Sequence, residues 1–174
     1  MTTTPPPADP QSLPYRAGVG IMVLNREGLA WVGRRADAHD DAEACWWQMP
    51  QGGIDDDEDP ERAAFRELFE ETSIKSIEII TQTPDWLTYD LPPHLISKVW
   101  GGRYRGQRQK WYLVRFVGEE TEIDLGAPGS PNAEFVAWRW CAPKDLPSVI
   151  IPFKRDLYNE VLRIFAPELT QSGG

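Results

Sequence analysis

The chain has 174 residues and is 41% hydrophobic, which is enough for one soluble domain with a sizeable core. Its net charge of −9 argues against sequence-independent binding to long nucleic acid, DNA included, and no apolar run approaches the ~20 residues that span a membrane. The two cysteines, Cys45 and Cys141, indicate no disulfide framework, as expected of a cytoplasmic protein.

The two ends of the chain are predicted to lie outside the domain. Residues 1–14 are rich in threonine and proline and lack the apolar region of a secretory signal, so we expect a disordered tail. Residues 15–167 are expected to form a single domain, and residues 168–174 a second disordered tail.

Two apolar runs near the start of the domain predict paired strands. Residues 17–24 are expected to form a buried strand and residues 29–34 its partner, with a turn over 25–28. A polar loop is expected over 36–44. In the segment 46–53 that follows, two adjacent glycines allow the backbone to bend tightly or to approach a ligand.

A helix is predicted over residues 60–72. Asp59 is a suitable N-cap, Pro60 suits the first helical position, and nothing before Thr72 breaks a helix. At roughly 100° per residue the helix has two faces. The apolar face is expected to be buried and consists of Ala64, Phe65, Leu68 and Phe69. The charged face is expected to point outward and consists of Arg66, Glu67, Glu70 and Glu71.

Further elements follow the helix. Strands are predicted over 77–83, 110–117 and 135–140, and an amphipathic helix over 153–165 that ends near Pro167. Strands on both sides of a central helix, followed by a final helix, indicate an α/β sandwich.

Residues 91–118 contain no acidic side chain, although the chain as a whole is acidic. The stretch is either an ordinary exposed basic loop or a wall that faces phosphate groups opposite the acidic helix. Its basic residues are Lys98, Arg103, Arg105, Arg108, Lys110 and Arg115.

The carboxylates of the predicted helix also allow two interpretations. They are either a solvated face with Arg66 and Glu70 paired at i,i+4, or a metal site. Glu67 and Glu71 share the i,i+4 spacing and repel each other, and Glu70 adds a third charge. A divalent cation such as Mg²⁺, which prefers oxygen ligands, would neutralise such a cluster.

Residues 52–74 resemble the Nudix box, GX5EX7REUXEEXGU, in which U is a bulky apolar residue. The matching residues are Gly52, Glu58, Arg66, Glu67, Leu68, Glu70, Glu71 and Ile74. Ser73 departs from the motif, since it stands where the box has glycine. That glycine would follow the helix in a left-handed conformation, which would cost Ser73 roughly 1 kcal/mol. The resemblance implies a Nudix-type α/β/α sandwich with a mixed β-sheet.

Outside the box, the chain resembles the Nudix subgroup of bacterial RNA pyrophosphohydrolases and (di)nucleoside polyphosphate hydrolases. The resemblance covers residues 15–166 and includes Tyr15-Arg16, 46–53 (WWQMPQGG), 86–89 (WLTY), 106–111 (GQRQKW), Glu122-Ile123, Glu134-Phe135 and 153–155 (FKR).

The subgroup implies a hydrolase in which water attacks a phosphorus atom of a nucleoside 5′-phosphate chain. The first hypothesis is an RNA 5′-pyrophosphohydrolase that removes pyrophosphate from triphosphorylated RNA 5′ ends, with a role in mRNA decay. The alternative is a dinucleoside polyphosphate (diadenosine tetraphosphate) hydrolase. A catalytically inactive nucleotide-binding module is a remote alternative, because such a module would be expected to lack a box glutamate and all four are present.

The resemblance also implies a divalent metal cofactor, Mg²⁺ in the first place and Mn²⁺ or Zn²⁺ as alternatives. Arg66 is expected to orient the carboxylates. Glu58 is expected to be structural or to support them. Glu122 is either a metal ligand or general base, or an exposed glutamate. The expected metal ligands are Glu67, Glu70, Glu71, Glu122 and the carbonyl of Gly52.

Eight side chains are expected to bind the substrate, which is an RNA 5′ end or a dinucleoside polyphosphate. Arginine and lysine suit phosphate groups, and the aromatic residues either stack on bases or pack in the core. Protein partners are not predicted. The eight residues are Arg16, Arg34, Arg35, Tyr89, Arg108, Lys110, Phe153 and Lys154.

Overall fold

The computed structural model describes residues 9–35, 46–126 and 134–172. The strands are β1 (Tyr15–Leu24), β2 (Ala30–Arg35), β3 (Trp47–Gln48), β4 (Gln51–Gly53), β5 (Ile77–Gln82), β6 (Leu87–Asp90), β7 (Gly106–Phe116) and β8 (Phe135–Cys141). The α-helices are α1 (Pro60–Thr72), α2 (Pro93–Ile96), α3 (Leu146–Val149) and α4 (Arg155–Ser172). Short 3₁₀ helices are Pro10–Ser12, Trp100–Gly102, Glu120–Glu122, Pro143–Asp145 and Pro152–Lys154.

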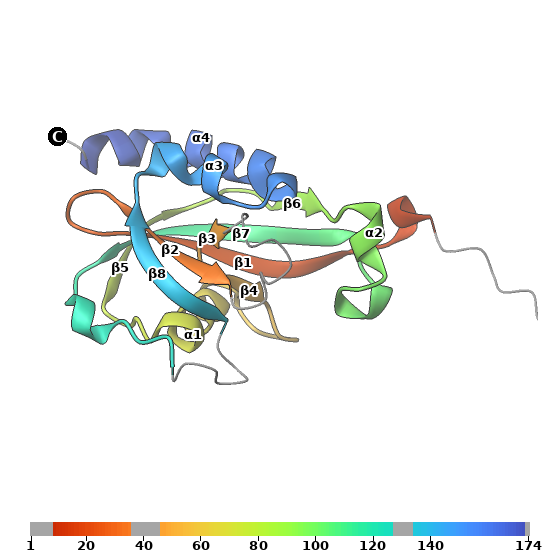
Figure 1. The fold of residues 1–174 in the computed structure, drawn as a ribbon, viewed down its shortest axis with the longest axis horizontal. Helices are drawn as coiled ribbons and strands as arrows, with labels where there is room; N and C mark the ends of the chain where they lie inside the picture. Colours follow the sequence, from red (N-terminus) through yellow and green to blue (C-terminus); the bar gives the residue numbers. More distant parts are fainter. Residues whose placement is uncertain (1–8, 36–45, 127–133, 173–174) are drawn as a thin grey trace, which may run out of the picture.

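β1 is the central strand of an eight-stranded mixed sheet (Figure 1). It pairs in parallel with β7, from Tyr15 opposite Gly106 to Leu24 opposite Arg115, and antiparallel with β2 and β4. β5 and β6 both pair with β7, and β8 pairs with β2. The predicted mixed sheet is confirmed. β1 and β7 begin earlier than their apolar runs indicate, because polar residues at their starts continue the hydrogen-bonded ladder.

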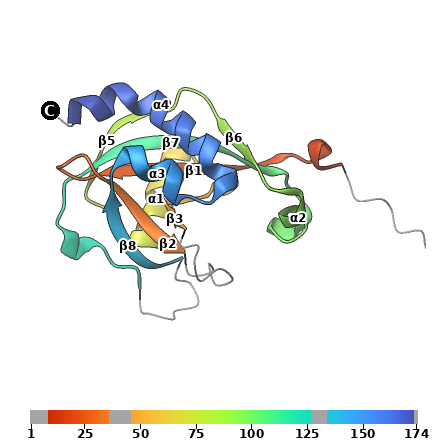
Figure 2. The same ribbon diagram turned by 45° about the horizontal axis from the view of Figure 1, so that its top comes forward.

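Helices cover both faces of this sheet, with α1 on one side and α3 and α4 on the other (Figure 1, Figure 2). The side chains of β1 alternate between the two cores. Val19 and Ile21 pack on the α1 side with Leu68, whereas Met22 packs on the α4 side with Phe165. The predicted α/β/α sandwich is therefore confirmed.

Both predicted ends of α1 are present. The side chain of Asp59 caps the first turn, and Pro60 occupies its first position. The helix ends at Ser73, whose φ of 66° and ψ of 7° place it in the left-handed region. The backbone N–H of Ser73 donates to the carbonyl of Phe69 (2.8 Å), and its hydroxyl donates to the carbonyl of Asp124 (3.0 Å). Ser73 thus adopts the conformation of the glycine that it replaces.

The face that α1 buries differs from the predicted one. Ala64, Leu68 and Glu71, spaced as i, i+4 and i+7, point toward the sheet, and only 6% of Glu71 is exposed. Phe65 and Phe69 lie at the edge of this stripe and are 39% and 53% exposed. The prediction that both phenylalanines are buried and that Glu71 points outward is wrong. Helical periodicity defines a broad apolar arc, but it does not determine which part of that arc packs against the sheet.

The closing helix is longer than predicted. α4 begins at Arg155 and continues through Pro167 to Ser172, so the prediction that it ends near Pro167 is wrong and residues 168–172 belong to the helix. Proline removes one backbone hydrogen bond but does not have to stop a helix that packs well on both sides of it. Here Phe165 and Leu169 both pack against the core on the α4 side.

Some sequence predictions lie outside the described residues: the first eight residues of the N-terminal tail, the whole of the polar loop 36–44 and the last two residues of the C-terminal tail. Within the ranges that are described, no helix combines the length and the apolar composition needed to cross a bilayer.

Candidate functional site

Arg66 is the hub of the charged residues on α1. Its guanidinium donates two hydrogen bonds of 2.8 Å to the carboxylate of Glu58, one of 2.9 Å to Glu67 and one of 3.3 Å to Glu70. A further hydrogen bond of 2.9 Å reaches the carbonyl of Gly53. The hydrogen bonds from Arg66 lower the pKa of Glu58 to about 2, and this carboxylate raises the pKa of Arg66 in turn. Arg66 therefore joins the helix, the preceding loop and β4.

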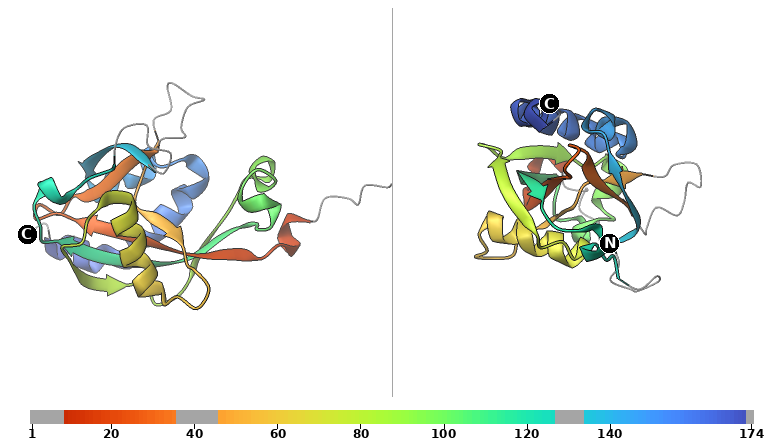
Figure 3. Two further views of the ribbon diagram at one scale, coloured as in Figure 1. Left: turned by 90° about the horizontal axis from the view of Figure 1, so that it is seen from below. Right: turned by 90° about the vertical axis from the view of Figure 1, so that its left-hand side faces the viewer.

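The carboxylate of Glu67 lies directly against Gly52. A Cβ atom on Gly52 would come within 2.0 Å of the carboxyl carbon of Glu67, so any side chain at this position would displace the Glu67 carboxylate. On the other side, a Cβ atom on Gly18 of β1 would lie 2.8 Å from the carbonyl oxygen of Gly52. Glycine at Gly18 therefore allows β1 to approach β4, and glycine at Gly52 keeps the place of the Glu67 carboxylate of α1 free; the three elements lie together in Figure 3.

Glu71 is buried and only partly satisfied. Its Oε2 atom has no hydrogen-bond partner. Burial raises the pKa of Glu71 well above its usual value, and the negative charges of Glu134 and Glu67 raise it further. Burial also raises the pKa of Glu67, although Arg66 opposes this effect. The structure thus holds several carboxylates close together with incomplete compensation of their charge.

Glu134 is a functional candidate that the sequence analysis did not select. It precedes β8, lies beside the box glutamates, and its Oε2 atom is 3.8 Å from Nη1 of Arg35. The Glu134-Phe135 pair was part of the subgroup resemblance, which was the available signal. The prediction named Glu122 instead, because the sequence alone does not show which of Glu122 and Glu134 lies near α1 in the folded protein.

The structure does not bring Glu122 to the cluster of box glutamates. Its carboxylate accepts hydrogen bonds from the backbone N–H groups of Lys75 (3.1 Å) and Ser76 (3.0 Å) and from the hydroxyl of Ser76 (2.6 Å). Partial burial opposes the effect of these bonds, but together they lower the pKa of Glu122. Glu122 thus stabilises the turn between α1 and β5.

A cleft of about 780 Å³ extends from Gly52 and Glu67. Five of the eight predicted substrate-binding residues line it: Arg16, Arg35, Tyr89, Phe153 and Lys154. The other lining residues are Trp46, Gln48, Gln51, Gly52, Gly53, Glu67, Leu91, His94, Leu95, Val99, Trp100, Gln107, Glu134, Ile150 and Ile151. Trp46, His94 and Trp100 were not among the predicted substrate-binding residues. Trp46 belongs to the segment 46–53 that contributes to the family resemblance, whereas His94 and Trp100 belong to no recognisable pattern.

One wall of the cleft combines aromatic and basic side chains. The rings of Tyr89 and Phe153 have centroids 6.1 Å apart. The ammonium group of Lys154 lies 5.1 Å from the Tyr89 ring and 5.9 Å from the Phe153 ring, and the residue is only 6% exposed. Burial raises the pKa of Tyr89 to about 12, so its hydroxyl remains a hydrogen-bond donor at neutral pH. This wall suits a ligand with both phosphate groups and a ring.

Three predicted substrate-binding residues, Arg34, Arg108 and Lys110, do not line this cleft. The guanidinium of Arg108 and the ammonium of Lys110 lie 4.3 Å and 5.5 Å from the ring of Trp86. Lys110 also donates to the carbonyl of Pro84 (3.1 Å). Because side chains alternate along a strand, Gln107 points into the cleft and its neighbour Arg108 points to the other face of the sheet.

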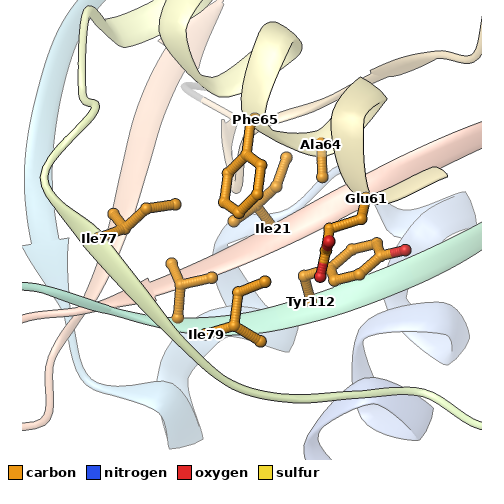
Figure 4. Close-up of a pocket in the computed structure, with 8 residues that line it drawn as sticks. Ile21, Glu61, Ala64, Phe65, Ile77, Ile79 and Tyr112 are labelled. Atoms are coloured by element: carbon orange, nitrogen blue, oxygen red, sulfur yellow. The ribbon is translucent and has the colours of Figure 1, made fainter. Parts of the chain in front are cut away.

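A second hollow lies on the α1 side of the sheet (Figure 4). It is bordered by apolar side chains such as Phe65, Ile77 and Ile79 and has no room for a water molecule. Glu61 and Tyr112 supply the polar groups at its edge, as Figure 4 shows. A phosphorylated substrate does not fit such a surface, so the cleft at Gly52 and Glu67 is the candidate active site.

The donor set of this site fits a hard divalent cation. In the described ranges, no three His, Cys, Asp or Glu side chains are gathered into a ready chelate. Glu67 and Glu70 instead both bind Arg66. The unpartnered oxygen of Glu71 and the Glu67 carboxylate beside Gly52 nevertheless supply carboxylate oxygens, which are the ligands that Mg²⁺ prefers.

Comparison with known proteins agrees with this geometry. Residues 14–161 match the family model of the NUDIX domain. RNA pyrophosphohydrolases from Cereibacter sphaeroides (strain KD131 / KCTC 12085) and Nitrobacter winogradskyi are 51% and 54% identical to the chain. The alignments cover 92% and 88% of this chain, and 96% and 91% of those proteins.

Solved structures of low sequence identity share the fold. The Escherichia coli dihydroneopterin triphosphate pyrophosphohydrolase is 17% identical with a TM-score of 0.64, over 84% of this chain and 96% of that one. A Caenorhabditis elegans Ap4A hydrolase in a binary complex is also 17% identical with a TM-score of 0.57, over 86% of this chain and 98% of that one. On the strength of the domain match and of the relatives of more than 50% identity, the chain belongs to the Nudix family of hydrolases.

Proposed function

We propose that this protein is an RNA 5′-pyrophosphohydrolase, which hydrolyses the triphosphate at an RNA 5′ end and releases pyrophosphate. The observation that carries the proposal is the continuity of the cleft. Glu67 and Gly52 of the box line the same cleft as the basic and aromatic wall of Tyr89, Phe153 and Lys154. Relatives of 51% and 54% identity over most of their length carry the name RNA pyrophosphohydrolase, which supports the choice of substrate.

The metal site proposed here differs from the expected one at a single residue. Glu67, Glu70, Glu71 and the carbonyl of Gly52 would hold Mg²⁺, and Glu134 takes the place of Glu122 beside them. The ion, when bound, supplies charge neutralisation for phosphate oxygens and lowers the pKa of the attacking water. Mn²⁺ and Zn²⁺ remain alternatives to Mg²⁺. Arg66 fixes the orientation of Glu67 and Glu70 through its hydrogen bonds.

The substrate is bound by side chains that line the cleft. Arg16, Arg35 and Lys154 bind phosphate oxygens, because charge-assisted hydrogen bonds are roughly twice as strong as neutral ones. Phe153, which is partly exposed in the cleft, holds a base by stacking, which is worth about 1–3 kcal/mol for each base. Tyr89 is buried and packs against the Phe153 ring. We assign no role in substrate binding to Arg34, Arg108 and Lys110, because they do not line the cleft.

A dinucleoside polyphosphate would engage the same carboxylates and the same wall, and it is the competing substrate. The two activities are separated by assaying triphosphorylated RNA and diadenosine tetraphosphate side by side at equal concentrations, with Mg²⁺. We expect the larger kcat/KM with RNA, and pyrophosphate as its product. A larger kcat/KM with the dinucleotide would assign the enzyme to the alternative. Hydrolysis of neither substrate, with nucleotide binding retained, would point to an inactive module.

A further inference from the structure

Trp100 is a cleft residue to which the proposed function gives no role. It lies in the segment 91–105 between β6 and β7, at the far end of these strands and beside the start of β1 (Figure 3). Its φ of 51° is in the left-handed region, which bulky residues rarely adopt. Gly101 and Gly102 continue this conformation with φ of 67° and 74°. A strained backbone at a non-glycine residue persists where its surroundings hold it in place, and such residues cluster at functional sites.

The ring of Trp100 has a specific partner. The guanidinium carbon of Arg16 lies over this ring, 5.3 Å from its centroid. Tyr104 packs against the ring edge-on, with centroids 6.2 Å apart and planes at 82°. A guanidinium that stacks on an aromatic face keeps its N–H groups, which point outward in its own plane, available for hydrogen bonds. Trp100 can therefore fix the plane of Arg16 without using its donors.

Arg16 is held at the box end of the cleft. A Cβ atom on Gly53 would lie 2.2 Å from Nη2 of Arg16, so the guanidinium rests directly on the glycine that follows the first residue of the box. Arg16, Trp100, Gly53 and Glu67 all line the same cleft. Among the described residues, no carboxylate forms an ion pair with Arg16. None of the described carboxylates thus neutralises its positive charge, which is available to a ligand.

The segment that carries Trp100 is anchored at its base. The backbone N–H of Leu91 donates to the carbonyl of Arg105 (2.8 Å), and the N–H of Arg105 donates to the carbonyl of Pro14 (3.0 Å). The side chain of Arg105 also pairs with Asp90 at 2.9 Å. These bonds fix the segment to the strand that carries Arg16, so the stacked pair forms before any ligand binds.

We propose that Trp100 is a positioning residue that holds the guanidinium of Arg16 over Gly53, where it binds the polyphosphate of the substrate. The inference rests on the proposed function for the nature of the substrate. The segment 91–105 would then contribute to substrate binding through Trp100 and not through its basic side chains.

The first test measures the KM for triphosphorylated RNA, kcat, and the Kd for inorganic tripolyphosphate. Trp100→Leu removes the aromatic face and keeps apolar bulk, and should raise both KM and Kd about 3- to 10-fold with kcat unchanged. Trp100→Phe keeps a face and should restore both to within about twofold of the wild type. The matched control is Trp86→Leu, which removes a ring that stacks on Arg108 outside the cleft and should change neither constant.

The second test asks whether Trp100 acts through Arg16. Arg16→Gln should raise the Kd for tripolyphosphate, and adding Trp100→Leu to it should raise the Kd no further. Independent, multiplying effects of the two substitutions would overturn the inference, because Trp100 would then contact the ligand itself, for example by stacking on a base. Equal KM and Kd in the wild type and Trp100→Leu would also overturn it.

A measurement on the wild type keeps the inference testable if Trp100→Leu does not fold. In the NMR spectrum, the side-chain N–H resonance of Arg16, identified by its loss in Arg16→Gln, should be shifted upfield by the ring current of Trp100. A resonance at the usual position for arginine would contradict the stacking. Failure of the wild type to hydrolyse RNA would contradict the proposed function instead, and tripolyphosphate binding would still decide the role of Trp100.

Discussion

Glu71 carries the least compensated buried charge of the candidate site. One of its oxygens has no partner, and Glu67 and Glu134 raise the pKa of its carboxyl beyond the effect of burial. A buried charge without a counter-charge destabilises the folded state. Without a metal ion, the negative charge with which Glu71 would bind the metal therefore lowers the stability of the folded protein.

The substitution Glu71→Gln should separate these two effects. The neutral isostere removes the repulsion, so the melting temperature in EDTA should rise by a few degrees, while kcat falls by about 100-fold or more because a charged metal ligand is lost. Calorimetry and a pyrophosphate-release assay measure both quantities. Glu61→Gln, at an exposed position of the same helix, should leave kcat unchanged. A folded Glu71→Gln enzyme with near-normal turnover in saturating Mg²⁺ would remove Glu71 from the metal site.

Ser73 allows a test of the helix exit. The left-handed backbone favours glycine, but the serine hydroxyl also donates to the carbonyl of Asp124, so Ser73→Gly should stabilise the protein by less than about 1 kcal/mol. Ser73→Ala loses the hydrogen bond and keeps the strain. Chemical denaturation should therefore rank glycine above alanine by roughly 1 kcal/mol. Equal stabilities of the two variants would mean that the left-handed conformation at this position has little cost.

At the scale of elements, the Arg66 side chain holds the loop before α1, the helix and β4 together. Its ion pair with Glu58 and its hydrogen bond to the carbonyl of Gly53 join the segment 52–58 to the helix that carries Glu67, Glu70 and Glu71. The orientation of Glu67 thus depends on a contact made outside the helix.

The pair of Glu58 and Arg66 predicts a specific acid sensitivity. The pKa of Glu58 falls from 4.5 to about 2 on folding, so its stabilising effect is complete above pH 4.5 and is lost as the pH falls toward 2. Urea denaturation at about pH 7, 4.5 and 3 should show a steeper loss of unfolding free energy for the wild type than for Glu58→Gln. The exposed substitution Glu27→Gln should keep the steeper slope. Parallel curves for the wild type and Glu58→Gln would show that this ion pair adds no stability.

Local signals in the sequence were sufficient for α1, whereas the mixed sheet was predicted from the family resemblance. An N-cap, a proline and the box spacing define the helix because they act within one turn or a few residues. The end of α4 was mispredicted for the opposite reason. Packing of Phe165 and Leu169 against the sheet outweighs the local effect of Pro167, and a sequence pattern does not contain that packing.

At the scale of the molecule, the cleft collects residues that are far apart in the chain. Arg16 comes from β1, Glu67 from α1, Tyr89 from β6 and Lys154 from the turn before α4. The family resemblance identified these residues. It also selected Lys110 and Glu122, which the fold directs elsewhere, because the direction of a strand side chain or the path of a loop depends on the tertiary structure.

Two lysines provide a test of this arrangement. Lys110 binds the carbonyl of Pro84 outside the cleft, so Lys110→Met should leave KM and kcat for triphosphorylated RNA within about twofold of the wild type. Lys154 lines the cleft, so Lys154→Met should raise KM about 10- to 100-fold, which corresponds to one charge-assisted hydrogen bond. Steady-state kinetics at two salt concentrations give both constants. The reverse ranking would mean that the substrate binds on the face of Trp86.

The central claim is that hydrolysis takes place at a divalent metal ion held by the box glutamates together with Glu134. The most direct measurement is the rate of pyrophosphate release from triphosphorylated RNA as Mg²⁺ is titrated, for the wild type, Glu134→Gln and Glu122→Gln. The wild type should be inactive in EDTA and active with Mg²⁺, and Glu134→Gln should lose about 10- to 100-fold in rate or Mg²⁺ affinity. Glu122→Gln should keep near-normal turnover, although its melting temperature falls because its hydrogen bonds to Lys75 and Ser76 weaken. Normal turnover by Glu134→Gln with loss of activity in a folded Glu122→Gln would contradict the account.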